Sequence, residues 1–321
     1  MKRRFQNFKN ISKSKSFFVL SFCLIFLFKS CKDDKELNDL AINSVLKTIK
    51  IAESEKSNPS SEFNTYWYAG EAEISSYKLE QARYGEMREG TAVLVYVTED
   101  FLPDMQVKAD RKNSNNIPVL KLNTTKKFIT GIYPYSIMQS IFYPVSNNMH
   151  AIKNSISMQE WCGHAYTQLN NREQFEIISH SYFEGEADEN FKINKAILES
   201  ELWVQLRINP KSLPTGDLQI IPSFEYSRLH HSKIKSFKAT AVLTSNTYSI
   251  YYPELNRTLS ITFKPNFPFD ILNWKETQKS GYGVNAKILT TKATKLKTIK
   301  SPYWEKNKNK DESIRKILKL Q

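Results

Sequence analysis

The sequence has few glycines and cysteines and lacks the best-known catalytic motifs. Nine glycines and three cysteines occur among its 321 residues. A chain so poor in glycine offers few backbone cradles for phosphate, and it contains no Gly-x-x-x-x-Gly-Lys loop, Gly-x-Ser-x-Gly elbow or His-Glu-x-x-His pair. Three cysteines exclude a disulfide-rich scaffold. The sequence leaves enzymatic activity uncertain and favours a non-enzymatic protein without a cofactor.

The formal net charge of +13 suggests a nucleic-acid partner until it is divided along the chain. Residues 1–30 carry seven basic side chains and no acid, and residues 287–321 carry eleven basic side chains against three acids. The body between them therefore has a net charge of −2. Because the charge lies at the two ends, we expect no nucleic-acid partner.

A signal peptide is predicted over residues 1–30. Twelve mostly apolar residues, Phe17 to Phe28, follow the basic segment. This run is shorter than the roughly 20 residues that a membrane-spanning helix needs, and it resembles a cleavable secretory signal.

Ser30-Cys31 resembles the lipobox of bacterial lipoproteins, although Lys29 stands where a small neutral residue is usual. The resemblance implies cleavage before Cys31 and acylation of that residue, and two or three acyl chains would anchor the protein durably to a membrane. The alternative is an uncleaved N-terminal anchor. The acidic cluster of residues 32–36 resembles the surface-export signal of Bacteroidota lipoproteins, with a solvated tether as the alternative. The expected location is the outer membrane, lipid-anchored, on its periplasmic or cell-surface face.

Four segments are expected along the chain. Residues 31–62 are predicted to be a flexible, lipidated tether that ends in a Ser-, Asn- and Pro-rich stretch. From residue 63, aromatic and β-branched runs alternate with turn signals, which predicts an antiparallel β-rich domain over residues 63–290. This domain could contain two subdomains with a boundary near residues 150–190. Residues 291–321 are predicted to be a basic tail with a short helix.

One helix interrupts the strands. Leu198, Leu202 and Leu206 recur at helical spacing, which predicts a helix over residues 195–207 with Asn194 as its N-cap. The expected fold is therefore mainly β, a curved antiparallel sheet or half-barrel with one central helix. The order of elements in residues 190–290 is similar to that of half-barrel lipoprotein-carrier folds. The main strands are expected at residues 66–68, 72–81, 91–98, 117–122, 128–145, 158–169, 175–183, 218–226, 236–243, 247–252, 258–263 and 282–290.

Cys162 and His164 are the first candidates for catalysis, because two residues apart on a strand place both side chains on one face. A thiol nucleophile also needs a base within hydrogen-bond reach and a group that orients the base. Cys162 would be the one side-chain thiol left after export and lipidation. A lone cysteine is most often a small buried apolar residue, which is our first interpretation, and an envelope hydrolase is the alternative.

His180 extends this pair to a possible metal site. With a loop over residues 170–174, His164 would lie directly opposite His180, at a Cβ distance of about 5 Å. Two imidazoles and the thiol of Cys162 suit Zn²⁺ or copper. This site is a hypothesis, because a one-residue shift of the strand register would destroy it.

Four further features each allow a plain and a functional interpretation. His230-His231 and the acidic segment Glu184–Glu189 are expected to be solvated turns, with metal or calcium binding as the alternative. The amphipathic residues 311–320 predict a short helix that docks on the body or lies on an anionic membrane surface. Tyrosine-rich segments fit sheet packing or a carbohydrate or lipid groove. They contain Tyr133, Tyr135, Phe142, Tyr143, Tyr248, Tyr251 and Tyr252.

Four segments resemble a family of exported flavobacterial lipoproteins without an established activity. They are residues 71–85, 131–139, 159–164 and 221–226. Some members carry the label septum formation inhibitor Maf, but true Maf proteins are cytoplasmic nucleotide pyrophosphatases with a Ser-x-Ser-x-x-Arg motif, which does not open the body here. The resemblance implies an outer-membrane lipoprotein of unknown molecular function. The expected partners are the membrane, through Cys31, and an envelope lipid, glycan or protein.

Overall fold

The computed structural model describes residues 59–146 and 150–320, so the signal peptide, Cys31 and most of the expected tether lie outside the described residues. The described residues belong to one compact unit, Ser54–Gln321. They are mainly β, as predicted, and form one sheet of 16 strands. Within the described ranges, no helix is both long and apolar enough to cross a bilayer.

Most strands pair with their neighbours in the sequence in an antiparallel manner. The first strand, β1, pairs with the last strand, β16, so these two strands lie side by side in the middle of the sheet. Antiparallel neighbours can be joined by tight turns, which suits a sequence with many short turn signals. The strands are β1 Ala72–Arg83, β2 Glu86–Leu102, β3 Val107–Lys108, β4 Ile117–Thr130, β5 Tyr133–Pro144, β6 Lys153–Glu160, β7 Gly163–Asn171, β8 Phe175–Ser181, β9 Glu189–Ile193, β10 Ile197–Leu198, β11 Gly216–Ile221, β12 Phe237–Leu243, β13 Thr247–Tyr252, β14 Arg257–Phe263, β15 Ile271–Ser280 and β16 Lys287–Ser301.

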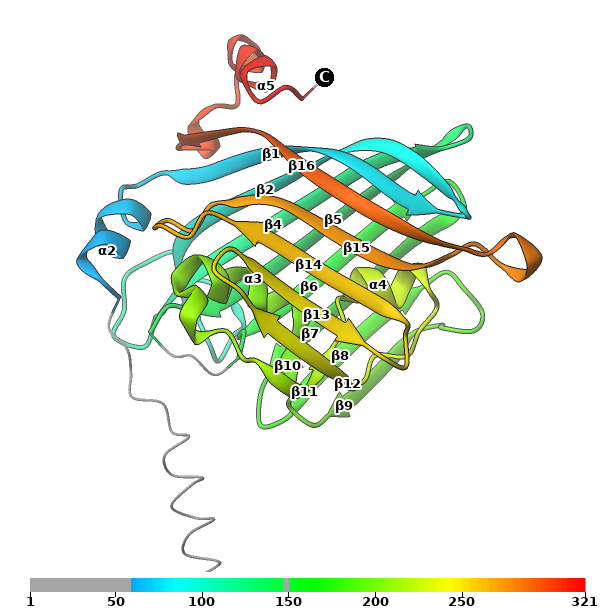
Figure 1. Ribbon diagram of the computed structural model, residues 1–321. Coiled ribbons are helices and arrows are strands. Elements are labelled where there is room, and N and C mark those ends of the chain that lie inside the picture. Colours follow the sequence, from blue (N-terminus) through cyan, green and yellow to red (C-terminus); the bar gives the residue numbers. More distant parts are fainter. Residues whose placement is uncertain (1–58, 147–149, 321) are drawn as a thin grey trace, which may run out of the picture. The chain divides into compact units, whose positions relative to one another are not determined.

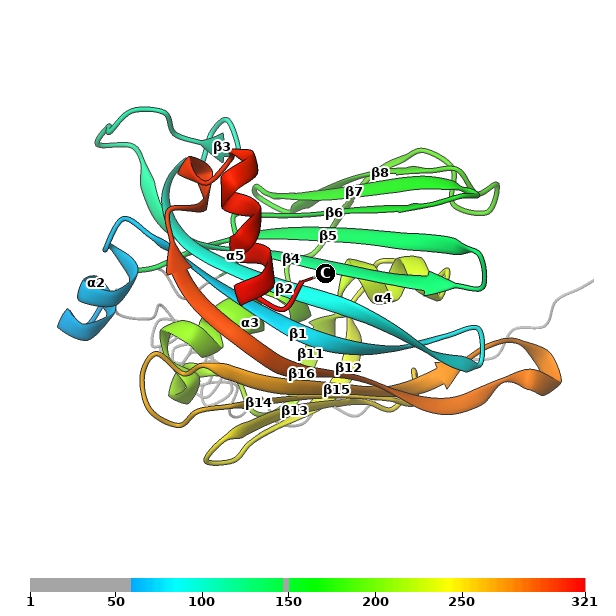
Figure 2. The same ribbon diagram turned by 90° about the horizontal axis from the view of Figure 1, so that it is seen from above.

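The sheet curls around two helices, α3 (Glu199–Ile208) and α4 (Phe224–Leu229). Strands β5 to β8 face strands β12 to β15 across these helices, while β16, β1 and β2 join the two halves (Figures 1 and 2). The sheet is open, because β9 and β10 are its two edges. The predicted curved half-barrel around a helix is therefore confirmed.

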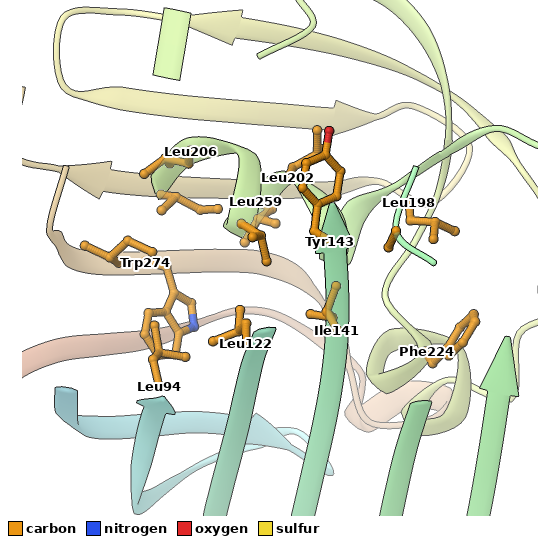
Figure 3. Packing of buried hydrophobic residues seen from close by; sticks show 14 of the residues in the cluster. Leu94, Leu122, Ile141, Tyr143, Leu198, Leu202, Leu206, Phe224, Leu259 and Trp274 are labelled. Carbon is orange, nitrogen blue, oxygen red and sulfur yellow. The ribbon is translucent and has the colours of Figure 1, made fainter. Parts of the chain in front are cut away.

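The concave face of the sheet and helix α3 share one apolar core. Along β14 every second residue is buried, which is the pattern of a sheet with one covered face. Leu198, Leu202 and Leu206 all lie in this core, as their spacing predicts, and they pack with Leu259 and Trp274 (Figure 3). Burial of each such side chain contributes about 1.5–3 kcal/mol.

Polar side chains of α3 fix the helix to the sheet as well. Arg207 at its C-terminal end pairs with Glu73 of β1, and Glu199 at its first turn pairs with Arg257 of β14. Glu201 caps the helix by accepting a hydrogen bond from its own N-cap residue, Leu198. We call Glu199, Glu201 and Arg207 the α3 anchors.

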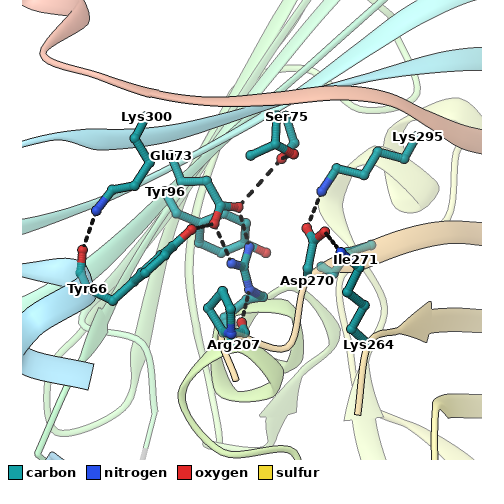
Figure 4. A network of polar contacts seen from close by, with 12 residues as sticks. Tyr66, Glu73, Ser75, Tyr96, Arg207, Lys264, Asp270, Ile271, Lys295 and Lys300 are labelled. Carbon is teal, nitrogen blue, oxygen red and sulfur yellow. Dashed lines mark hydrogen bonds and ion pairs between the residues drawn. The ribbon is translucent and has the colours of Figure 1, made fainter. Parts of the chain in front are cut away.

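The pair between Arg207 and Glu73 is bidentate and inaccessible to solvent. Both nitrogen–oxygen distances are 2.7 Å, and each side chain is 1 % exposed (Figure 4). Tyr66 donates a 2.5 Å hydrogen bond to the same carboxylate, and the ring of Tyr96 lies 4.7 Å from the guanidinium carbon. Burial alone would raise the pKa of Glu73, but Arg207 and Tyr66 outweigh it and lower the pKa to about 2.

The helix predictions need three corrections. Helix α3 begins at Glu199 rather than at residue 195, because Ile197 and Leu198 first pair as a parallel strand with β11, and Asn194 is not its N-cap. Aromatic residues led us to expect strands where α2 (Ser61–Trp67) and α4 lie. Both helices are capped by a serine side chain, Ser60 for α2 and Ser223 for α4.

The predicted start of the basic tail, residue 291, is too early. Residues 291–301 belong to β16, between β15 and β1, so the lysines there alternate with inward-facing residues such as Ala293. The chain then forms α5 (Ser313–Ile317), and Leu318 after it is buried on the outer face of β1 and β2. The docked helix is therefore observed, and its apolar residues Ile314 and Leu318 face the body. This cover also explains why β1 is buried on both faces along its first half.

We predict that Glu73→Gln destabilises the protein by about 3–5 kcal/mol, because it leaves the buried charge of Arg207 without a counter-charge. The lowered pKa of Glu73 stabilises the fold fully above its ordinary value of about 4.3, and this contribution is lost as the pH falls from there toward 2. Denaturant unfolding from pH 7 to pH 2 measures both effects. The matched control is Glu89→Gln, because Glu89 is 86 % exposed and pairs with Lys78 at 3.6 Å. Equal losses for the two variants would contradict the prediction.

Candidate functional site

The candidate site lies at the end of the half-barrel where four hairpins turn. The ends of β1, β4, β6 and β15 and the beginnings of β2, β5, β7 and β16 meet there, because antiparallel pairing places alternate turns at the same end. The C-terminal end of α4 contributes as well. Together they surround a cavity of about 80 Å³, which we call the Arg83 cavity. It is lined by Arg83, Tyr84, Tyr135, Met158, Glu160, Cys162, Gly163, Ala165, Phe183, Arg228, His231 and Tyr282.

Arg83 is the last residue of β1 and is held by uncharged groups. Its guanidinium donates to the backbone oxygen of Leu229 at 2.7 Å and to the hydroxyls of Tyr84 and Tyr135 at 3.1 and 3.2 Å. The ring of Tyr84 also stacks on it, 4.1 Å from the guanidinium carbon. Its Nε atom is shielded from solvent and has no hydrogen-bond partner among the described residues.

The missing counter-charge separates Arg83 from the other sheltered arginines. Within residues 59–146 and 150–320, five arginines are buried or partly buried, and four of them pair with a carboxylate. Arg83 has no acidic side chain within 4.0 Å in these ranges, although an arginine stays protonated at any physiological pH. A sheltered charge without a partner is costly, so it needs an explanation. The four paired arginines are Arg88, Arg207, Arg228 and Arg257.

The hairpin that holds Arg83 is strained. Tyr84 and Gly85 form its two-residue turn with φ of +55° and +79°, a geometry that favours Asn-Gly. A tyrosine with positive φ costs about 1–2 kcal/mol. In return, the Tyr84 hydroxyl lies 2.8 Å from that of Tyr135 and both contact Arg83. Strain of this kind is concentrated at binding and catalytic sites.

A second arginine reaches the cavity from α4. Arg228 pairs with Glu186 at 3.2 Å, and its guanidinium carbon lies 4.0 Å from the ring of Phe183. His231, with a φ of +51°, contacts the same carboxylate at 2.6 Å. The Nε atom of Arg228 is buried and has no partner in the described part of the chain. The acidic turn of residues 184–189 and the His230-His231 pair are thus joined by an ion-pair cluster.

Cys162 lines this cavity but is not the buried residue that we expected. It lies in the turn between β6 and β7 and is exposed. Its backbone N–H donates to the carboxylate of Glu160 at 2.7 Å. A hydrogen bond to Glu160 raises the pKa of the thiol, which lowers the fraction of the reactive thiolate. This environment is the opposite of what an activated nucleophile needs.

The predicted pairing of His164 with His180 is wrong. The β7–β8 loop spans residues 172–174, because Asn171 still pairs with Phe175, and this shifts the register by two residues. His180 consequently lies opposite Tyr166 and contacts Asp188 at 3.2 Å, while His164 pairs with Gln159 on the other side. Both imidazoles are exposed. The residues described contain no group of three or more side chains placed to hold a metal ion.

The tyrosine-rich segments divide between the core, the cavity and the exposed surface, where Tyr251 lies. Tyr143, Tyr248 and Tyr252 are buried, and each hydroxyl has a hydrogen-bond partner in the interior, so these tyrosines serve packing. Tyr135 lines the Arg83 cavity, and the ring of Tyr133 lies 6.0 Å from it. A carbohydrate or lipid groove formed by all these segments together is therefore not present.

The interior of the half-barrel has little free volume. A cavity of about 40 Å³ lies between α3 and the sheet, and it is lined by apolar side chains such as Trp274 together with paired charges such as Arg257 and Glu276. A water molecule needs about 10–15 Å³ of such space, so this cavity suits a few waters and no acyl chain. The Arg83 cavity is twice as large and lies at the end of the sheet.

Sequence reasoning missed Arg83 and Arg228. Arg83 stands directly before a Tyr-Gly pair that we used as a turn signal, and a tyrosine in that position was the available hint of strain. Its lack of a counter-charge depends on contacts 52 and 146 residues away, to Tyr135 and Leu229, which a single sequence does not reveal.

Comparisons with known proteins add little beyond this geometry. No family model matches the chain, and no curated protein sequence matches it. A crystal structure of a beta-barrel-like protein of the domain of unknown function DUF1849 from Brucella abortus is similar at a TM-score of 0.42 and 4 % identity. The match covers 72 % of this chain and 98 % of that chain. The fold and the cavity by themselves define a class, an open β half-barrel with an arginine-lined cavity at one end.

We predict that Cys162 reacts slowly with iodoacetamide at pH 8 compared with a free cysteine, because its raised pKa leaves less thiolate. Glu160→Gln should accelerate alkylation by lowering the pKa, whereas His164→Ala should leave the rate unchanged. Mass spectrometry of the Cys162 peptide across pH 6–10 measures the rates. A His164-dependent rate would instead support the hydrolase interpretation.

Proposed function

We propose that this protein is a lipid-anchored envelope protein that binds an anionic ligand in the Arg83 cavity without chemical conversion. The observation that carries this proposal is the sheltered guanidinium of Arg83, which has no counter-charge in the described structure. A carboxylate or phosphate in the cavity would supply that charge, because Arg83 and Arg228 both line it.

The charges around the cavity support an anion rather than a cation. Arg228 and His231 already share Glu186, and Glu160 is engaged by the backbone of Cys162. Of the arginines in the cavity lining, Arg83 is therefore the one without a carboxylate partner among the described residues. The volume of about 80 Å³ admits one small group, not a chain.

The lipid anchor rests on the sequence around Cys31 and places the binding domain at the outer membrane, on its periplasmic or cell-surface face. The flavobacterial lipoprotein family that the sequence resembles supports this location. An anchored protein with a preformed cavity is suited to retain a ligand of the cell envelope, and no step of this function requires a catalytic residue or a metal.

We predict that acetate and inorganic phosphate stabilise the full chain against thermal unfolding and that Arg83→Met lowers their affinity at least tenfold, which corresponds to 1.4 kcal/mol. The melting temperature is measured against anion concentration at constant ionic strength with chloride. Arg172→Met is the matched control, because Arg172 is exposed and lies outside the cavity lining.

The same variants test the missing counter-charge. Without ligand, Arg83→Met should leave the free energy of unfolding unchanged or raise it. Arg207→Met should lower the free energy of unfolding by about 3–5 kcal/mol, because Glu73 would remain buried without a cationic partner. If Arg83→Met were as damaging as Arg207→Met, or if anions stabilised it as well as the wild type, the proposed binding function would be wrong.

We predict that cells expressing the protein incorporate labelled palmitate into it and that Cys31→Ala abolishes the label. Protease treatment of intact cells then distinguishes the two faces of the outer membrane, because a surface-exposed domain is degraded and a periplasmic one is protected. Cys162→Ala is the control and should keep the label. Palmitate incorporation that persists in Cys31→Ala would refute lipidation at this residue.

A further inference from the structure

Exposed aromatic rings border the Arg83 cavity. Trp161, Tyr182 and Tyr282 are 69 %, 68 % and 63 % exposed, and Tyr84 is 39 % exposed. Tyr84 and Tyr282 line the cavity themselves, while Trp161 and Tyr182 directly adjoin the lining residues Cys162 and Phe183. We call these four residues the aromatic rim. Large aromatic rings held in solvent around a cavity are a common mark of a binding surface.

Two rings of the rim contact neighbouring groups. The ring of Tyr182 lies over the backbone of Gly163, where an added Cβ would come within 2.8 Å of the Tyr182 Cγ atom. Trp161 lies 6.4 Å from Tyr133, which in turn lies 6.0 Å from Tyr135 in the cavity wall. The rim therefore continues the cavity wall outward as a series of aromatic faces.

A ligand that fits both the Arg83 cavity and the aromatic rim must carry one small anionic group. It must also carry a ring that stacks on aromatic faces while the rest of the ligand remains hydrated. The 80 Å³ cavity and the filled interior leave no room for an acyl chain. A sugar ring has apolar C–H faces and hydrated hydroxyls, and tyrosine and tryptophan combine an apolar face with a polar edge in the same way. A carboxylate on that sugar would supply the negative charge that Arg83 lacks among the described residues.

We propose that the ligand is an acidic carbohydrate, with the carboxylate of a hexuronate in the Arg83 cavity and its sugar ring on the aromatic rim. This inference rests on the proposed anion-binding function and names its ligand class. Arg83 recognises the charge, and Trp161 provides the stacking face. An exposed rim suits the end of a glycan, because the remaining sugars can extend into solvent.

The experiment measures binding of glucuronate, galacturonate, glucose and acetate to the full chain in detergent, by calorimetry and tryptophan fluorescence. We expect at least one hexuronate to bind at least tenfold more tightly than both acetate and glucose. Trp161→Ala should remove this advantage while leaving the acetate affinity unchanged, and Arg83→Met should weaken both hexuronate and acetate at least tenfold. Trp304→Ala is the matched control, because Trp304 is 47 % exposed and follows the opposite end of β16.

The outcomes separate this inference from the function on which it rests. Hexuronates that bind no better than acetate, or that are unaffected by Trp161→Ala, would overturn the carbohydrate assignment and leave the anion site intact. Glucose binding as tight as hexuronate binding would overturn it as well, because the charge would then be irrelevant. If the unmodified protein bound none of the anions tested, both proposals would be overturned.

Discussion

The ion pair between Arg207 and Glu73 is the constraint on which the half-barrel depends. An open sheet with a packed concave face could accept a helix in several positions, because apolar contacts are non-directional. Arg207 and Glu199 remove that freedom, since each of these buried charges must meet its own partner, Glu73 on β1 or Arg257 on β14. A buried pair adds little net stability compared with apolar packing, so its main effect here is to specify one position for the helix.

That position determines where a ligand can bind. With α3 seated in the concavity, the space between the two halves of the sheet is filled by Leu202, Trp274 and their neighbours. The interior retains about 40 Å³ and the charges around it are paired. Binding is therefore displaced to the end of the half-barrel, where hairpin turns can carry unusual backbone geometry without disturbing the core.

The sequence allowed the class of fold to be predicted because local periodicity encodes it. The spacing of Leu198, Leu202 and Leu206 predicted α3. The alternation of apolar and polar residues predicted strands such as β14. The predictions that were wrong depended on contacts between distant residues or on a loop length that the sequence leaves open. The β7–β8 loop could be three or five residues long, and this difference alone separated His164 from His180. The lysines of β16 resembled a solvated tail because the pairing partner that makes this segment a central strand, β1, lies more than 200 residues away.

The candidate site was less predictable than the fold, because its defining property is an absence. Cys162 and His231 were visible as reactive residue types, and both do line the Arg83 cavity. Arg83 became informative only by comparison with Arg207, which has the same side chain, a similar aromatic neighbour and a bidentate carboxylate. A protein selected for stability alone would pair or replace Arg83, as it pairs Arg207. The strained turn at Tyr84 adds a second cost at the same position. The unpaired charge of Arg83 and the positive φ of Tyr84 both destabilise the protein at one cavity, which is consistent with selection for a ligand that offsets them. A bound anion would neutralise Arg83 and hold the tyrosines in the geometry that the turn imposes.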